Sequence, residues 1–308
     1  MTELARVDAN FAGLVGPVVV ACSGGADSIG LLVLATEAGL APVAVHVDHG
    51  LRPDSAADVG VVAEAADALG VEWRSVRVEV GPGANLEARA RAARYRALED
   101  AREQLAATAI LVAHTADDQA ETVMLNLLRG SASAGLAGMA DRRGAIARPA
   151  LRIRRAELRS VADAHGLQVV DDPTNADTRW RRAWIRHEVL PMLATGARRD
   201  LVPVLARQAD VFRSESEYLD QLGDGLLSKA GDDPSLGGPA VAVLRAAPVV
   251  VTRRAIRRWL GFPPPSADEV ERVLGVVRGE RVACELAGGR RVRRASGRLQ
   301  LDGSHQLP

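Results

Sequence analysis

The sequence predicts an α/β protein: a doubly wound parallel sheet, then a long connecting helix and a small α+β domain at the C-terminal end of the chain. Short apolar runs alternate with stretches of helical periodicity between residues 18 and 128, as in parallel sheets covered by helices. Polar clusters follow three of the apolar runs, and ligands bind such sheets at the carboxyl ends of their strands. A basic segment after residue 230 indicates a second, smaller unit.

Four strands are predicted in the first part of the chain. The first is the apolar run 18–21, which follows Gly16 and Pro17 and is typical of a buried parallel strand. The other three are the apolar and β-branched runs 43–47, 73–80 and 109–113. Helical spacing predicts helices between and after these strands, at 29–35, 55–69, 85–107 and 118–128. The short connections favour parallel pairing.

The second part of the chain is predicted to be mostly helical at first. Residues 129–148 are rich in Gly, Ala and Ser and are expected to form a mobile loop that closes over a site. Helices are predicted at 153–165, 179–193, 201–229, 250–260 and 267–278, and short strands at 281–286, 290–294 and 298–301. The predicted domains are a catalytic domain over 1–197, a connecting helix over 198–230 and a small basic domain over 231–308.

Composition places the chain among soluble globular proteins. It has 308 residues, 47% of them hydrophobic, and a formal net charge of zero. Neither an apolar run of bilayer length nor a signal-peptide pattern is found in the sequence, so we expect a cytoplasmic protein without a membrane partner. Cys22 and Cys284 lie far apart, which argues against a zinc site, an iron–sulfur site and a disulfide framework. The sequence leaves the oligomeric state open, and a homodimer is compatible with it.

Charge is unevenly distributed along the chain. Residues 141–200 contain 13 arginines and 8 acidic residues, and residues 251–298 contain 12 arginines and 5 acidic residues. Residues 1–140 have the opposite balance, with 10 basic and 18 acidic residues. Because the planar guanidinium group suits phosphate, these basic stretches are consistent with a polyanionic partner. A compositional bias towards arginine on a solvated surface is the alternative.

A Gly-rich turn follows the first predicted strand, and its residues are Ser23, Gly24, Gly25, Ala26, Asp27 and Ser28. A strand, a Gly-rich turn and a helix point backbone N–H groups and a helix N-terminus at one place, which suits phosphate. A carboxylate beside phosphates, here Asp27, implies Mg²⁺. The turn lacks the Gly-Lys-Ser/Thr of the Walker motif. An ordinary capped turn is the alternative.

A second polar cluster, HVDHGLR (His46–Arg52), follows the next strand. Asp48 and Asp27 end adjacent strands, so they can share a metal ion or position a substrate amine; a capping carboxylate is the alternative for Asp48. His46 and His49 have the i, i+3 spacing of metal ligands. We do not favour metal binding by them, because His46 alternates with valines and is expected to lie within the sheet.

Two helical segments contain further polar groups. Glu87, Arg91, Arg94 and Tyr95 fall near one face of the helix at 85–107, where an ion-paired, solvated face is the alternative to a site. After the fourth strand come the polar residues His114, Asp117, Asp118 and Glu121. Carboxylates at a helix start favour capping, but four polar groups exceed what one cap needs. Such a cluster suits a site for a cationic amine.

Taken together, these segments resemble the PP-loop ATP pyrophosphatases and, more narrowly, the tRNA(Ile)-lysidine synthetase family. The resemblance covers residues 18–191 and rests on the following stretches in order: SGGADS (Ser23–Ser28), HVDHGLR (His46–Arg52), NLEARARAARY (Asn85–Tyr95), HTADDQAETVMLNLLRG (His114–Gly130), SASAGLAGM (Ser131–Met139), Arg148-Pro149, DDPTN (Asp171–Asn175) and RHEVLP (Arg186–Pro191). One departure is Ala183, where the family usually has Asn after Arg. The C-terminal part matches only in size and basic character.

The resemblance implies a PP-loop type of sheet and a two-step ligase reaction that uses ATP and Mg²⁺. ATP adenylates the C2 oxygen of the wobble cytidine in an isoleucine tRNA with a CAU anticodon, and the ε-amine of L-lysine then attacks C2 and displaces AMP. It implies that Ser23–Ser28 bind ATP, that Asp27 binds the metal, and that Asp118 and Glu121 bind lysine. The implied catalytic residues are Asp27, Asp48, Arg94 and His114, with Asp48 and Asp118 both open as acceptors of the lysine proton. The implied tRNA-binding residues are Arg182, Arg186, Arg253, Arg257 and Arg293.

Two alternatives accompany this interpretation. Another PP-loop enzyme, such as a tRNA thiolase, generally needs paired cysteines, and Cys22 and Cys284 are badly placed for that chemistry. A non-catalytic tRNA-binding protein with a vestigial nucleotide loop is the other.

Overall fold

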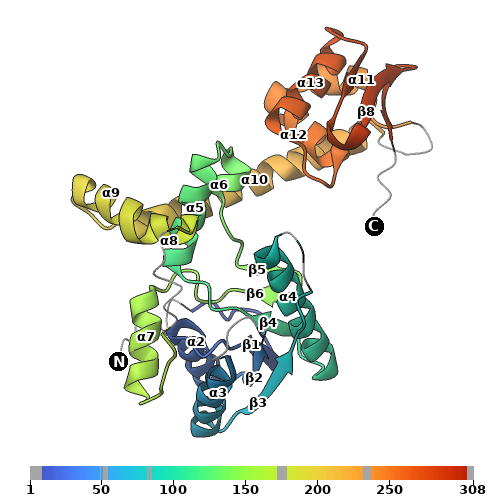
Figure 1. Ribbon diagram of the computed structural model, residues 1–308. Helices are drawn as coiled ribbons and strands as arrows, with labels where there is room; N and C mark the ends of the chain where they lie inside the picture. The colour runs from blue at the N-terminus through green and yellow to red at the C-terminus, as the bar shows by residue number, and fades with distance from the viewer. Residues whose placement is uncertain are drawn as a thin grey trace. The chain divides into compact units, whose positions relative to one another are not determined.

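The computed structural model describes residues 9–48, 50, 55–81, 83, 85–171, 179–231 and 237–303. The chain divides into two compact units, Met1–Arg213 and Ser214–Pro308 (Figure 1). His49, Leu51 and Arg52 of the HVDHGLR stretch and residues 172–175 of the DDPTN stretch lie outside the described residues.

The first unit contains a six-stranded, mostly parallel sheet, which confirms the predicted fold class. Its strands are β1 (Pro17–Ala21), β2 (Ala41–Asp48), β3 (Glu72–Arg77), β4 (Ala109–Leu111), β5 (Arg142–Arg143) and β6 (Ile146–Ala147). They lie in the order β3-β2-β1-β4-β6-β5. In the parallel register, Val19 of β1 is the partner of Val43 in β2 and of Ile110 in β4. The carboxyl ends of these three strands therefore lie at one edge of the sheet.

Alternate residues of β1 point into two separate cores, as expected for a buried strand. Val18 and Val20 pack with α2 (Ala26–Glu37) and α3 (Ser55–Leu69) on one face of the sheet. Val19 and Ala21 pack with α4 (Leu86–Gln104) on the other face. Figure 1 shows α4 on the opposite side of the strands from α2 and α3. This two-sided burial explains why the strand is an unbroken run of apolar residues.

A close contact between two helices positions the start of α7 (Arg155–Ala164). A Cβ atom at Gly30 of α2 would lie 2.4 Å from the carbonyl oxygen of Leu158 in α7. Only glycine permits the two backbones to approach this closely. Because α2 begins directly after the SGGADS turn, the contact fixes the N-terminal residues of α7 relative to that turn.

The segment 129–148 is more structured than the sequence predicts. It contains the short helix α6 (Ser133–Leu136) and the antiparallel pair β5 and β6, and β6 also pairs with β4. The prediction of an unstructured loop was wrong here, because each strand has only two residues and shows no periodicity. The pairing places Arg148 directly beyond β6, near the carboxyl end of β4.

A series of helices completes the first unit. The helix α5 (Ala116–Leu128) follows β4, and α8 (Arg181–Trp184) continues through a π-helical turn (Ile185–Val189) into α9 (Leu190–Ala197). Ile185 and Val189 pack against Ala120 and Met124 of α5 in one apolar cluster. This packing brings the π-helical turn next to α5. The long helix α10 (Val202–Lys229) follows.

The second unit is a small α+β structure. Its helices are α11 (Val241–Ala246), α12 (Val249–Leu260) and α13 (Ala267–Arg278), and its antiparallel strands are β7 (Ala283–Glu285), β8 (Arg291–Ala295) and β9 (Arg298–Asp302). A 3₁₀ turn, Ala287–Gly289, connects β7 to β8. Ile256, Val273 and Leu299 are buried in its core. Among the described residues, none of the helices has the length and apolar character needed to cross a membrane.

Candidate active site

The SGGADS turn presents an open helix N-terminus. Gly24 has φ +83°, and a Cβ there would lie 3.1 Å from Cγ2 of Val170, so this position requires glycine. The hydroxyl of Ser28 donates a hydrogen bond to the Gly25 carbonyl at 2.9 Å and accepts one from the Ser23 N–H at 3.2 Å. Helix α2 has no side-chain cap. Its first N–H groups are thus left for an anion, which the helix dipole also favours.

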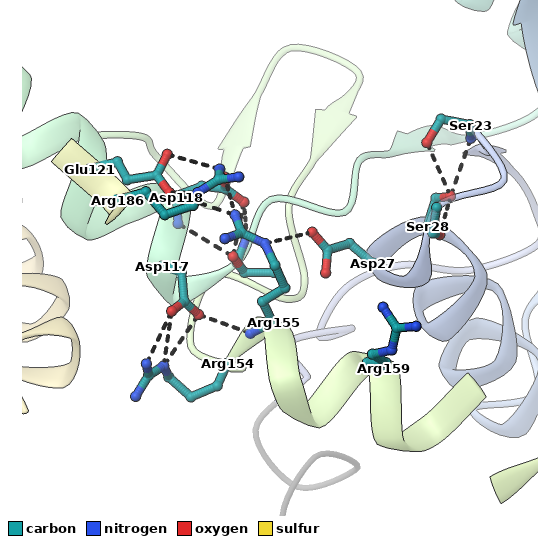
Figure 2. A network of polar contacts seen from close by, with 12 residues as sticks. Ser23, Asp27, Ser28, Asp117, Asp118, Glu121, Arg154, Arg155, Arg159 and Arg186 are labelled. Carbon is teal, nitrogen blue, oxygen red and sulfur yellow. Dashed lines mark hydrogen bonds and ion pairs between the residues drawn. The ribbon is translucent and has the colours of Figure 1, made fainter. Parts of the chain in front are cut away.

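Asp27 lies in the first turn of α2 with one carboxylate oxygen paired and one unpaired. Its Oδ2 accepts a hydrogen bond from Nε of Arg155 at 3.1 Å (Figure 2). Its Oδ1 is buried and has no hydrogen-bond partner among the described residues. Burial raises the pKa of Asp27 to about 6. Leaving a buried carboxylate oxygen unpaired is costly, so a cation from outside the chain is the expected partner of this atom.

These features fit Mg²⁺ bound through one protein ligand. No group of three or more His, Cys, Asp or Glu side chains that could hold a metal occurs within the described ranges. Mg²⁺ commonly takes one or two carboxylates and completes its shell with phosphate oxygens and water. The unpaired Oδ1 of Asp27, beside an open anion site, meets that requirement.

Two carboxylates of α5 meet two arginines near Asp27. Arg155 donates to Asp118 at 2.8 Å and lies 3.7 Å from Glu121. Arg186, in the π-helical turn, donates to both oxygens of Glu121, at 2.6 and 3.2 Å. Figure 2 shows Arg155 between Asp27 and the α5 carboxylates. Glu121 is buried, and burial raises the pKa of its carboxyl group.

The network carries an excess of one negative charge. It contains three carboxylates, those of Asp27, Asp118 and Glu121, and two guanidinium groups, those of Arg155 and Arg186. A single ammonium group would balance this excess. Asp118 also closes a capping box, because its Oδ2 accepts hydrogen bonds from the N–H and the hydroxyl of Thr115, both at 2.9 Å. Capping and participation in the site are therefore compatible.

The neighbouring carboxylate, Asp117, makes a separate set of contacts. It pairs with Arg154 at 3.0 Å and accepts a hydrogen bond from the backbone N–H of Arg155 at 2.8 Å. These contacts tie the start of α5 to the start of α7. They lower the pKa of Asp117, although burial alone would raise it. We therefore assign Asp117 to holding Arg155 in place.

A cluster of cations lies around His114 at the carboxyl end of β4. Nε of Arg148 donates to Nδ1 of His114 at 3.2 Å, and burial is the main cause that lowers the His114 pKa to about 4. The imidazole is therefore neutral at pH 7. Arg91, Arg94 and Arg148 all contribute positive potential at this ring.

Arg94 stands out in this cluster. Burial lowers its pKa, and the nearby charge of Arg91 acts in the same direction. Arg91 itself donates to the hydroxyl of Tyr95 at 3.3 Å and lies 5.1 Å from the centre of its ring. In the described part of the chain, the Arg94 guanidinium makes no ion pair or hydrogen bond. A desolvated cation without an anion indicates a binding site for one.

The residues at the end of β2 lie apart from the carboxylate network. Asp48 accepts a hydrogen bond from the Gly50 N–H at 2.8 Å. His46 is buried, and its Nδ1 lies 3.0 Å from the carbonyl oxygen of Cys22. This is the position within the sheet that the valine alternation predicts. Burial lowers the pKa of His46.

Most arginines expected to contact tRNA are engaged within the chain. Arg186 binds Glu121, Arg253 pairs with Glu271 at 2.5 Å, and Arg293 pairs with Asp302 at 2.7 Å. Arg257 donates to the carbonyl oxygen of Pro265 at 2.8 Å. Of the five, Arg182 alone has no such partner among the described residues.

Sequence reasoning missed Arg155 as a site residue. Its partner Asp27 lies 128 positions away in the chain, and Arg155 belongs to a run of four residues that contains three arginines, Arg152, Arg154 and Arg155. The position of Arg155 at the start of a predicted helix was the only available signal, since it indicates that the side chain lies near a strand edge.

Comparisons with known proteins identify relatives of the chain. Residues 11–193 match the family model described as a PP-loop domain. The tRNA(Ile)-lysidine synthase of Salinispora tropica is 41% identical over 302 residues, which covers 92% of this chain and 90% of that protein. The synthase of Rhodococcus erythropolis is 42% identical over 244 residues, 79% of this chain and 73% of that protein. The Thermus thermophilus synthase is 42% identical over 254 residues, but the chain spans only 48% of its length.

A solved structure supports the fold. The U34-tRNA thiolase NcsA from Methanococcus maripaludis superimposes with a TM-score of 0.54 over 68% of this chain and 76% of the thiolase. At 16% identity, this similarity concerns the fold alone.

Proposed function

The chain belongs to the tRNA(Ile)-lysidine synthase family of PP-loop proteins, and we propose that it performs that reaction. It transfers the adenylyl group of ATP to the oxygen on C2 of the wobble cytidine of a CAU-anticodon isoleucine tRNA. It then joins this carbon to the ε-amine of L-lysine, which makes the enzyme a carbon–nitrogen ligase that releases pyrophosphate and AMP.

One observation carries this proposal: an open anion site lies next to a carboxylate network with one unbalanced negative charge, and Asp27 belongs to both. The open N-terminus of α2 suits the pyrophosphate of ATP. The network of Asp27, Asp118 and Glu121 suits an ammonium group. A phosphate donor and a cationic amine are the two small substrates of the proposed reaction.

In the first step, the C2 oxygen of the cytidine attacks the α-phosphorus and pyrophosphate leaves. Negative charge builds on the leaving group and on the α-phosphate. The N–H groups of the SGGADS turn stabilise the first, and Arg94, a cation without a partner in the described residues, stabilises the second. Asp27 would hold Mg²⁺ through its Oδ1, and the metal would supply further charge neutralisation there.

In the second step, the ε-amine attacks C2 and the C2–oxygen bond to AMP breaks. The amine must be neutral to attack, so its proton passes to a carboxylate. Asp118 is better placed than Asp48 to accept it, because Asp118 belongs to the carboxylate network and Asp48 accepts a hydrogen bond in a turn. His114, neutral at pH 7, lines the site as a hydrogen-bonding group and not as a cation.

The cysteines do not favour the alternative of a thiolase. Cys22 is buried, and burial raises the pKa of its thiol to about 12. The nucleophilic form of cysteine is the thiolate, which such a pKa suppresses. Cys284 is also buried, and burial raises its pKa.

Lysine binding tests the proposed function residue by residue. The full chain is incubated with ATP, Mg²⁺, CAU-anticodon tRNA and radiolabelled lysine. We expect label in the tRNA, and we expect Asp118→Asn to raise the KM for lysine at least about tenfold, because a charge-assisted contact is lost. Asp67→Asn, at an exposed position of α3, is the control for the same chemical change and should leave this KM unchanged. Absence of label with the wild-type chain would refute the function.

A further inference from the structure

Two exposed tryptophans and two exposed arginines form a surface on the helix that supplies Arg186. We name Trp180, Arg181, Arg182 and Trp184 the Trp–Arg surface. Trp180 is 59% exposed and Trp184 is 38% exposed. The N–H of Trp184 donates to the carbonyl of Trp180 at 2.9 Å. Residues four apart on a helical turn lie on the same side of it, and this hydrogen bond places Trp180 and Trp184 one turn apart.

Exposure of these rings is unusual for this chain. The sequence contains four tryptophans, and the other two, Trp73 and Trp259, pack against apolar cores. On the other side of the same turn, Ala183 and Ile185 are buried. Large exposed aromatic side chains gathered at one place mark a binding surface.

The arginines between the rings are free to meet an anion. Arg181 and Arg182 are both exposed, and neither guanidinium has an ion pair or hydrogen bond among the residues that the structure describes. This distinguishes them from Arg154, Arg155 and Arg186, which all bind carboxylates. Unpaired cations beside flat apolar rings complement nucleic acid, whose phosphates are anionic and whose bases stack.

The location narrows the kind of nucleic acid. Trp184 lies two residues before Arg186, which binds Glu121 of the carboxylate network. Arg182 lies four residues before Arg186 and shares its side of the helical turn, so we expect the neighbours of a nucleotide that reacts beside this network to lie near the Trp–Arg surface. Bases can stack on protein side chains only when they are unstacked from their own helix, as they are in RNA loops.

We propose that Trp180 and Trp184 stack unpaired bases of the RNA loop beside the reacting nucleotide, while Arg181 and Arg182 contact the adjacent phosphates. This inference rests on the proposed function for the identity of the RNA, and it extends that function to side chains that read the flanking loop nucleotides. The buried side of the same turn holds the surface in place against α5 through Ile185.

Binding of an RNA hairpin with a CAU-containing anticodon loop tests the stacking. The intact protein is titrated with the hairpin while tryptophan fluorescence and the anisotropy of labelled RNA are recorded. Stacking should quench the fluorescence. Trp180→Ala and Trp184→Ala should each weaken binding at least about fivefold, whereas Trp180→Phe and Trp184→Phe should retain most of the affinity. Tyr218→Ala, at a 62% exposed aromatic position in the other unit, is the control and should bind normally.

Salt dependence separates the two kinds of contact. Arg181→Gln and Arg182→Gln should each lower the slope of log affinity against log salt by about 0.7 for each lost phosphate contact. The tryptophan variants should lower the affinity without changing this slope. A blunt RNA duplex of equal length should bind the tryptophan variants and the wild type equally, because its bases are already stacked.

Two results would overturn the inference: unchanged hairpin affinity in folded Trp→Ala variants, or equal losses for hairpin and duplex. Thermal midpoints identify any variant that fails to fold. If an Ala variant does not fold, the corresponding Phe variant tests the stacking, because a loss of hairpin affinity with an aromatic ring retained would also contradict it. Lysine transfer by the wild-type chain is measured separately. If the wild-type chain transfers lysine and the Trp→Ala variants bind the hairpin normally, only the stacking is rejected. If the wild-type chain transfers no lysine, the proposed function is rejected.

Discussion

The guanidinium of Arg155 joins Asp27 of the SGGADS turn to Asp118 of α5, with N–O distances of 3.1 and 2.8 Å. One side chain thus links the anion site to the carboxylates that we propose bind lysine. The link depends on α7, which Gly30 allows to pack directly against α2.

Replacement of Arg155 by Gln should impair the second step more than the fold. The three carboxylates would retain one guanidinium, that of Arg186, and their mutual repulsion would misplace the amine. We expect kcat/KM for lysine to fall at least about tenfold. Arg159→Gln is the control on the same helix, since Arg159 pairs with the exposed Asp171. Equal effects of the two changes on kcat/KM would contradict the role of Arg155.

Replacement of Arg94 by Met should separate activity from stability. The change removes a desolvated cation that lacks a partner in the described residues, so we expect a thermal midpoint equal to or above that of the wild type. Adenylation should fall about 10²-fold or more, because charge on the α-phosphate loses its counterion. Arg96→Met, at an exposed position of the same helix, should change neither quantity. A destabilised Arg94→Met protein with normal adenylation would reject this role.

The pKa of Asp27 predicts a pH-dependent stability difference. Because burial raises this pKa from 3.8 to about 6, the folded ligand-free protein binds the proton more tightly than the unfolded chain. The carboxyl group's contribution to stability is therefore fully present below pH 4 and is lost as the pH rises through 6. Relative to the wild type, Asp27→Asn should gain up to about 3 kcal/mol in unfolding free energy between pH 4 and 7. Denaturant unfolding at the two pH values measures this gain, and a difference independent of pH would contradict the raised pKa.

Replacement of Gly30 by Ala should damage both the fold and the site. The added Cβ would lie 2.4 Å from the Leu158 carbonyl oxygen, so α7 must shift and carry Arg155 with it. We expect a loss of about 1–3 kcal/mol in unfolding free energy and a lower kcat/KM for lysine. Gly60→Ala in α3 is the matched control, because nothing lies within 4 Å of its Cβ position; it should gain up to about 1 kcal/mol. Similar stability changes in both variants would show that the close approach is unimportant.

Strands β1, β2 and β4 of the central sheet could be predicted because most of their residues are buried. Val18 to Ala21 form an unbroken apolar run for that reason, and the polar residues that follow the strands lie at the carboxyl edge. The pair β5 and β6 could not be predicted, because two-residue strands depend on pairing with β4 and not on local sequence. Helix α11, with six residues, was missed for the same reason of length.

Only those site residues that lie in recognisable motifs could be predicted from the sequence. Asp27, Arg94 and Asp118 stand in recognisable stretches, and the structure gives each of them an unusual environment. The role of Arg155 depends on tertiary contacts with residues far away in the sequence. The sequence also does not distinguish Arg253, which pairs with Glu271, from Arg182, because arginine is common throughout both basic stretches.

The most direct test of the proposed function is an incubation of CAU-anticodon isoleucine tRNA with the wild-type chain, ATP, Mg²⁺ and lysine. The nucleoside composition of the tRNA and the amount of AMP are measured in the same reaction. We expect one lysidine in place of the wobble cytidine for each AMP released. We expect no lysidine when lysine is omitted, and none in a CAU-anticodon tRNA that is specific for a different amino acid. An unmodified wobble cytidine in the complete reaction would contradict the proposed function.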